Sequence, residues 1–237
     1  MVKIVIAVLL SLVAALAAFA QEATKRNDRP QVPPVTTQAS PTALKTSDAA
    51  HYTWEFSQPE FLISHIVIEH DSQGRGNITF QRKNEDTPIV EPIELSTIAL
   101  ARIFGLWREL HFLDSDENYQ SPKSFANLGT YRIGLDDGKR KRIAEFNWSN
   151  NKTAWSLANE YRRAADQAIL VFNLNIAREM QPLNAPSLLN EMESLLRRDG
   201  LSDPHQLVPL LTELSTDEHL PLIARNQADR ILKKIGK

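Results

Sequence analysis

Two hairpin patterns, each followed by a helical pattern, are the feature that most constrains how this chain can fold. In both, a run rich in strand-forming side chains is followed by a turn segment and a second such run, as expected for antiparallel strands. The turn segments contain glycine and aspartate, which favour tight turns. The expected strands are residues 62–70 with 77–83 and residues 128–135 with 142–148, and the turns are residues 71–76 and 136–138.

Two further strands and two helices complete the expected sheet layer. Residues 52–57 have a strand pattern, and residues 88–94 predict an edge strand, where Pro92 does not break a central ladder. Ser96 is a suitable N-cap for a first helix, and a second, long helical pattern covers residues 152–180. Consecutive hairpins with helices gathered on one face predict an α+β protein with an antiparallel sheet, rather than a doubly wound parallel sheet.

The pattern changes after the long helix to helices alone. An α+β domain is therefore expected over residues 51–180, and a small all-α helical module over residues 181–237. The apolar spacing from Leu222 to Ile235 is similar to that of the second helix of a HEAT-type repeat. Because so few HEAT-like units cannot form a stable solenoid, the module is expected to dock on the first domain or on a partner.

The N-terminus has the pattern of an export signal. Lys3 precedes an apolar run from Ile4 to Phe19, and the small residues Ala18 and Ala20 form a cleavage motif, so residues 1–20 are expected to be a signal peptide cleaved after Ala20. The run would form a helix of about 24 Å, which is shorter than the roughly 30 Å hydrocarbon core of a bilayer. An uncleaved membrane anchor is the alternative.

Residues 21–50 are rich in proline and small polar side chains and hold few large apolar ones. Such a segment buries too little surface to offset the entropy of ordering it, so we expect a disordered linker.

Composition narrows the classes of function. The chain has no cysteine, which excludes disulfide scaffolds, thiol nucleophiles and thiolate metal sites. Its formal net charge of -2 argues against nucleic acid as the main partner. An exported chain without disulfides is more typical of bacteria than of eukaryotes, so we expect a periplasmic or secreted protein with no membrane span after signal cleavage.

Three features follow one another over about residues 60–170. A strand, a glycine-containing turn and a second strand precede a helix that ends in Leu110-His111-Phe112-Leu113-Asp114 before Tyr119, and a later strand reaches Leu135-Asp136-Asp137-Gly138-Lys139. This order resembles a group of small secreted bacterial domains of unknown function. The group usually carries a Cys-Gly-x-Cys-Pro signature near the first strand, which this chain lacks. The resemblance implies a similar fold and an exported location, and it implies no catalytic residues.

Asp114, Asp116 and Asn118 form the Asp-x-Asp-x-Asn string with which many calcium loops begin. Alternate oxygens on a tight turn could wrap a calcium ion. Tyr119 and Phe125 stand where an EF-hand needs glycine and a bidentate glutamate, so a polar loop without metal is the alternative interpretation. No other cofactor is expected.

Lys139, Arg140, Lys141 and Arg142 are the densest run of charge. As a binding surface, the run would suit an anionic polymer, a lipid headgroup or an acidic protein. Side chains alternate between the faces of a strand, so only two of the four would face one ligand. A solvated sheet edge that resists self-association is the alternative interpretation.

Other motifs are interpreted as structural or as chance matches. His65, Glu69 and His70 superficially match a zinc motif, but on a strand His65 and Glu69 lie about 13 Å apart and His70 points to the opposite face, so surface or strand-edge positions are expected. Ser149 and Lys152 match the Ser-x-x-Lys pattern of acyl-transfer enzymes without its partner motifs. The tryptophans could stack on sugars, although core packing is expected.

These observations leave three classes of function. The leading hypothesis is a non-catalytic exported binding or scaffold protein with a protein or an anionic polymer as its partner. A hydrolase with a site assembled from residues distant in sequence, and an accessory subunit of an envelope complex, are the alternatives. A deep polar pocket with several shifted pKa values would favour the enzyme, and an exposed apolar groove beside the helical tail would favour a binding protein.

Overall fold

The structure, a computed structural model, describes residues 50–236. The signal peptide expected at residues 1–20, and all but the last residue of the expected linker, lie outside the described residues. Within the described part, no helix combines the length and the apolar character that are needed to cross a membrane.

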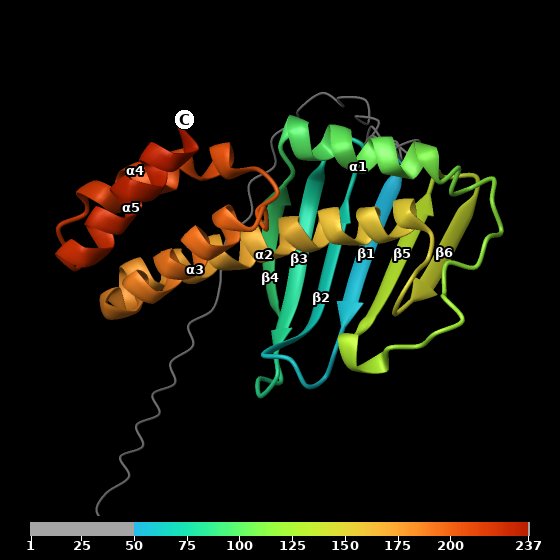
Figure 1. Cartoon of the computed structure of the whole chain (residues 1–237), viewed down its shortest axis with the longest axis horizontal. Helices are drawn as coiled ribbons and strands as arrows, with labels where there is room; N and C mark the ends of the chain where they lie inside the picture. Colours follow the sequence, from blue (N-terminus) through green and yellow to red (C-terminus); the bar gives the residue numbers. More distant parts are fainter. Residues whose placement is uncertain (1–49, 237) are drawn as a thin grey trace, which may run out of the picture. The chain divides into compact units, whose positions relative to one another are not determined.

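Six antiparallel strands form one sheet in the order β4-β3-β2-β1-β5-β6, so β4 and β6 are its edges (Figure 1). Every expected strand is present within two residues of its predicted bounds, and both expected hairpins form. Pro92 lies on an edge strand, as predicted. The strands are β1 (His51–Ser57), β2 (Ile63–His70), β3 (Arg75–Arg82), β4 (Ile89–Glu94), β5 (Thr130–Asp136) and β6 (Lys141–Phe146).

Helices α1 (Thr97–Glu109) and α2 (Lys152–Met180) cover one face of this sheet (Figure 1). Both begin at a side-chain cap, which pairs a backbone N–H of the first helical turn. The Ser96 hydroxyl accepts a hydrogen bond from the backbone N–H of Ala99, and the Asn151 side chain accepts one from the N–H of Ala154. The predicted α+β class is therefore confirmed.

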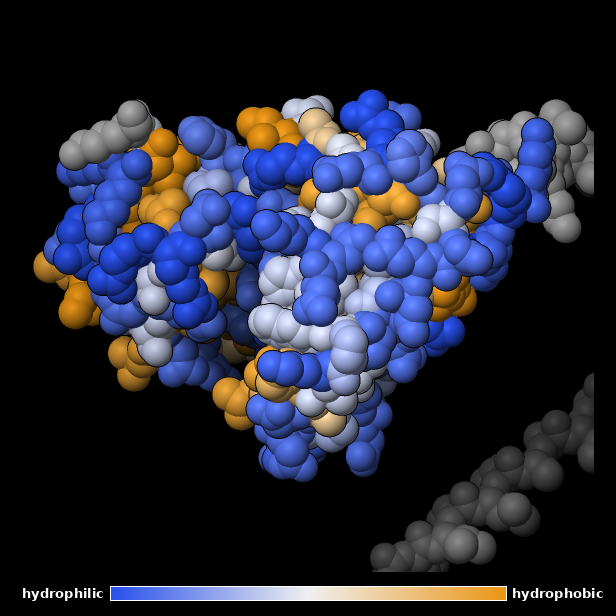
Figure 2. Space-filling model, turned by 45° about the vertical axis from the view of Figure 1, so that its right-hand side comes forward, coloured by the Kyte–Doolittle hydropathy of each residue, from blue (hydrophilic) through white to orange (hydrophobic). Residues whose placement is uncertain are grey.

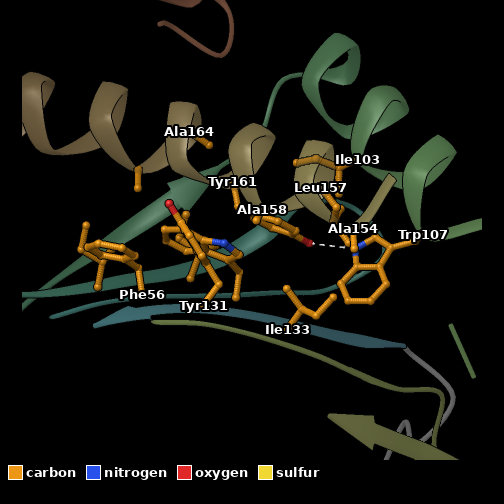
Figure 3. Close-up of a cluster of buried hydrophobic side chains, with 14 of the residues drawn as sticks. Phe56, Ile103, Trp107, Tyr131, Ile133, Ala154, Leu157, Ala158, Tyr161 and Ala164 are labelled. Carbon is orange, nitrogen blue, oxygen red and sulfur yellow. Dashed lines mark hydrogen bonds between the residues drawn. The ribbon is translucent and has the colours of Figure 1, made fainter. Parts of the chain in front are cut away.

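The main core lies between the sheet and these two helices. Small side chains on α2 face the strands, and aromatic rings from β1 and β5 pack beneath them (Figure 3). Because side chains alternate along a strand, the other face of the sheet carries polar groups such as Glu55 and His65. The largest fully buried side chains include Trp54, Phe56, Phe80, Ile133 and Tyr161.

The chain after α2 is helical, as predicted. It forms α3 (Ala185–Arg197), α4 (Val208–Thr216) and α5 (Leu222–Ile235), with short 3-10 turns at η2 (Pro182–Asn184) and η3 (Pro204–Leu207); a further 3-10 turn, η1 (Ala126–Leu128), precedes β5. These helices build a second apolar core, which also contains Leu170, Leu174 and Ala177 of α2. Packing therefore divides within α2, whereas the expected division lay after its last residue.

Hydrogen bonds hold the helical module against the first domain. The Arg163 guanidinium on α2 donates to the carbonyl of Leu201 at 2.8 Å, and that of Arg102 on α1 donates to the carbonyl of Ser202 at 2.5 Å. The module thus docks on the α+β layer, which is one of the two placements expected from the sequence.

Candidate functional site

A groove lies between the edge strand β4, helix α2 and residues 202–207, and we call it the β4–α2 groove. Its volume is about 520 Å³, within the range of ligand pockets in proteins. Ile93, Val171, Phe172 and Ile176 are among the apolar side chains that line it. The groove therefore has an apolar lining that remains open beside the helical tail.

Charge in the β4–α2 groove is of one sign. Among the described residues that line it, Glu91, Glu94 and Glu179 are acidic and none is basic. Glu91 faces the helices because it lies two residues from both Ile89 and Ile93 and so shares their face of β4. The Glu94 carboxylate lies 3.5 Å from the Arg75 guanidinium at the exposed edge.

Amide side chains fix the end of the groove. The Gln167 side chain accepts a hydrogen bond from the backbone N–H of Asp203 at 2.9 Å and donates one to the Gln206 side chain. Gln206 in turn donates to the carbonyl of Glu94 on β4. These bonds join α2 and β4 to residues 203–206 of the helical module (the helical tail), so the fold holds the walls of the groove in place.

A second cavity, the α2–α3 cleft, lies between these two helices and the loops that follow β1 and β3. Its volume is about 740 Å³. Side chains of the main core, such as Ile66, and of the helical core, such as Leu170 and Leu195, line it. On the face shown in Figure 2, apolar residues reach the surface in separate patches between hydrophilic ones.

An ion pair lies in the α2–α3 cleft. The Arg162 guanidinium donates to the Asp166 carboxylate at 2.9 Å and stacks over the Phe56 ring at 4.6 Å from its centroid. Burial raises the pKa of the Asp166 carboxyl, while Arg162 and Arg198 oppose that shift. A carboxylate held by arginine is a structural arrangement more than an acid–base pair poised for hydrolysis.

A buried chain of hydrogen bonds crosses the main core. His70 Nδ1 lies 2.7 Å from the carbonyl of Asp71, which can only accept, so Nδ1 carries the proton. His70 Nε2 then accepts from the Tyr161 hydroxyl at 2.7 Å, and Tyr161 accepts from the Trp107 indole at 3.1 Å (Figure 3). These groups are buried, so they have no access to a substrate.

The expectation that His70 lies at the surface or a strand edge is therefore wrong. His70 is on the face opposite to His65 and Glu69, as predicted, but that face is the one that the helices cover. Both ring nitrogens of the neutral imidazole have hydrogen-bond partners, so His70 can be buried at little cost. The alternation of side chains in the sequence does not reveal these partners.

The calcium candidates lie in the loop after α1. The Asp114 carboxylate pairs with the Arg140 guanidinium at 2.5 Å, and the Asn118 side chain accepts a hydrogen bond from the backbone N–H of Gln120. Across residues 50–236, no three His, Cys, Asp or Glu side chains form a group suited to a metal ion. A calcium site at Asp114, Asp116 and Asn118 stays a prediction.

The basic run 139–142 is engaged largely within the chain. Arg142 donates to the carbonyls of Phe112 and Glu117, both at 2.6 Å, and so fastens the loop after α1 to β6. Arg140 pairs with Asp114 and Asp137. The two candidate sites thus contact each other, and binding of an anionic partner by Lys139, Arg140, Lys141 and Arg142 stays a prediction.

The tryptophans divide between core and surface. Trp54 and Trp107 are buried, as expected for core packing. Trp148 and Trp155 are half-buried, with ring centroids 4.7 Å apart, and Phe125 packs edge-on against Trp148.

One cluster on the open face of the sheet has the residue types of a hydrolase. His65 Nε2 lies 2.9 Å from the Glu55 carboxylate, and Ser57 is the direct cross-strand neighbour of His65. Among the hydrogen bonds of the described residues, none joins Ser57 to His65, which a serine nucleophile would need. The cluster is therefore a weaker candidate than either cavity.

Comparison with known proteins adds no function. No protein-family model matches the chain, and no curated protein matches it.

Proposed function

We propose that this chain is a non-catalytic, exported binding protein that takes a basic and apolar peptide segment of a partner protein in the β4–α2 groove. The observation that carries the proposal is the combination of an apolar lining with acidic charge alone, beside the helical tail. An exposed apolar groove beside the helical tail favours a binding protein over an enzyme.

The apolar and acidic side chains of the groove determine which kind of ligand would fit it. Side chains such as Val171 and Phe172 would cover apolar groups of the ligand, and lysine or arginine would pair with Glu91 and Glu179. An extended peptide suits this position because β4 is an edge strand, and peptides commonly add to sheet edges.

The export part of the proposal is supported by the N-terminal pattern of residues 1–20 and by the absence of cysteine from the sequence. A tethering linker over residues 21–50 would leave the folded part free to meet its partner.

The test uses the full chain and two labelled peptides in fluorescence anisotropy. One peptide alternates lysine with valine, and in its match glutamate replaces lysine. We expect the lysine peptide to bind and the glutamate peptide not to bind. Equal binding of both, or binding of neither, would contradict the proposal.

A matched pair of variants locates the interaction. Glu179→Lys reverses a charge that lines the groove and should weaken binding of the lysine peptide by about tenfold. Glu218→Lys makes the same change at an exposed position between α4 and α5 and should leave affinity within about twofold. Equal effects would show that net charge, not the groove, governs binding.

A further inference from the structure

We propose that the α2–α3 cleft is a second binding site, which takes a small amphipathic monoanion such as a medium-chain carboxylate. Its apolar part would lie between the two cores and its anionic group at Arg198. The site is independent of the peptide groove, because no residue lines both cavities.

The position of the cleft favours a bound small molecule. It is the larger of the two cavities and lies where the main core and the helical core meet, and ligand sites often lie between packed units. Helix α2 presents Ala164, Ala168 and Val171 to the groove but Asp166, Ile169 and Asn173 to the cleft. The two cavities therefore lie on different sides of one helix.

The cleft offers apolar surface that the fold leaves uncovered. Leu62 is 86% exposed and Phe61 is 39% exposed, and both line the cleft together with the buried side chains of Ile66 and Leu195. An apolar chain lying here would remove this surface from water, which is favourable in proportion to the apolar area covered.

The charges of the cleft assign the ligand's headgroup. Arg82 is hydrogen-bonded to Asn173 and paired with Glu85, and the Arg162 guanidinium pairs with Asp166. Lys83 pairs with Glu60. The exposed Arg198, at the end of α3, makes no side-chain hydrogen bond or ion pair within residues 50–236, so its planar guanidinium is available for a carboxylate.

Asp166 influences which arginine the ligand meets. The ionisable groups that face its carboxyl are Arg162 on α2, Arg198 on α3 and Tyr131 on β5, and the cleft adds Arg82, Lys83, Glu85 and Glu191. The Asp166 carboxylate is hydrogen-bonded to Arg162, so the ligand meets the exposed Arg198 instead.

Isothermal titration calorimetry of the full chain with decanoate, and with decyltrimethylammonium as a cation of similar tail, tests the proposal. We expect decanoate to bind and the cation not to bind. Absence of decanoate binding, or equal binding of both amphiphiles, would overturn the proposal. Either result leaves the peptide test of the groove unaffected.

Neighbouring residues supply matched controls. Arg198→Glu should weaken decanoate binding by about tenfold, whereas Arg197→Glu, one position away and outside the cleft lining, should change it by less than about twofold. Leu62→Gln, which removes apolar surface without adding charge, should likewise weaken binding when compared with Leu183→Gln, since both leucines are exposed but only Leu62 lines the cleft. Equal effects within either pair would refute the assignment.

Discussion

His70 is a buried residue whose protonation state is fixed by its surroundings. It must stay neutral, because Nε2 accepts a hydrogen bond from the Tyr161 hydroxyl and the side chain is fully buried. Burial lowers the pKa of His70 below its ordinary value of 6.5, so the folded protein binds this proton more weakly than the unfolded chain does. The stability that neutral His70 provides is therefore complete above pH 6.5 and is lost as the pH falls below it.

Urea unfolding between pH 7.5 and 5 measures this effect. We expect the free energy of unfolding to fall with decreasing pH in the parent protein, and to fall less steeply in His70→Gln, which has no titrating group there. At pH 7.5 the variant should be less stable by about 1–3 kcal/mol, because the Tyr161 bond is disturbed. His111→Gln is the control: the His111 side chain is exposed and makes no hydrogen bond or ion pair among residues 50–236, so this variant should keep the parent slope. A parent slope retained in His70→Gln would contradict the assignment.

Residue roles were the part of the molecule least accessible to prediction from sequence. Strand alternation places His70 opposite His65, which is correct, but it cannot say which face the helices cover. The basic run shows the same limit. Arg142 is identifiable as a charge, yet its bonds to the carbonyls of Phe112 and Glu117 depend on a loop whose path no local pattern specifies.

At the level of elements, α2 joins the two cores and should make them unfold together. Leu157 belongs to the main core and Leu174 to the helical core, and both lie on this one continuous helix. Damage to the tail should therefore reach the sheet. The four tryptophans, Trp54, Trp107, Trp148 and Trp155, all lie before the tail, so their fluorescence reports the α+β layer.

Leu189→Ala tests this coupling. Leu189 is buried on α3 and belongs to the helical core, and the substitution should cost about 2–5 kcal/mol by leaving a cavity. We expect the tryptophan-fluorescence transition to shift together with the helical circular dichroism signal. An unshifted fluorescence transition with a separate, earlier loss of helix would show that the two cores are independent.

Elements themselves were predictable because their signals are local. The cap at Ser96, the turn glycine Gly74 with its positive φ of 76°, and the bounds of the long helix all follow from short-range chemistry. The division of packing within α2 was not predictable in this way. Both halves of the helix are buried, and sequence periodicity does not say which partner buries each half.

For the whole molecule, neither cavity was predictable, because each is assembled from residues far apart in the chain. The β4–α2 groove brings Glu91 of β4 beside Glu179 of α2 and Gln206 of the tail. None of these residues belongs to a motif. The sequence indicated only two parts of the groove's surroundings, an edge strand and a helical tail, and did not indicate that they lie together.

The proposed export of the whole chain rests on one short segment, residues 1–20. Signal peptidases require small residues at the first and third positions before the cleavage site, and for the proposed cleavage after Ala20 these positions are Ala20 and Ala18. In a bacterial host, we expect a C-terminally tagged chain to be recovered from the periplasmic fraction or the medium, with a mass that corresponds to a start at Gln21. Ala18→Arg with Ala20→Arg should block processing and leave the full-length mass, whereas Ala23→Arg, just after the site, should still be cleaved. Recovery of the unprocessed parent chain from the cytosol would contradict export, and with it the setting in which the peptide groove is proposed to work.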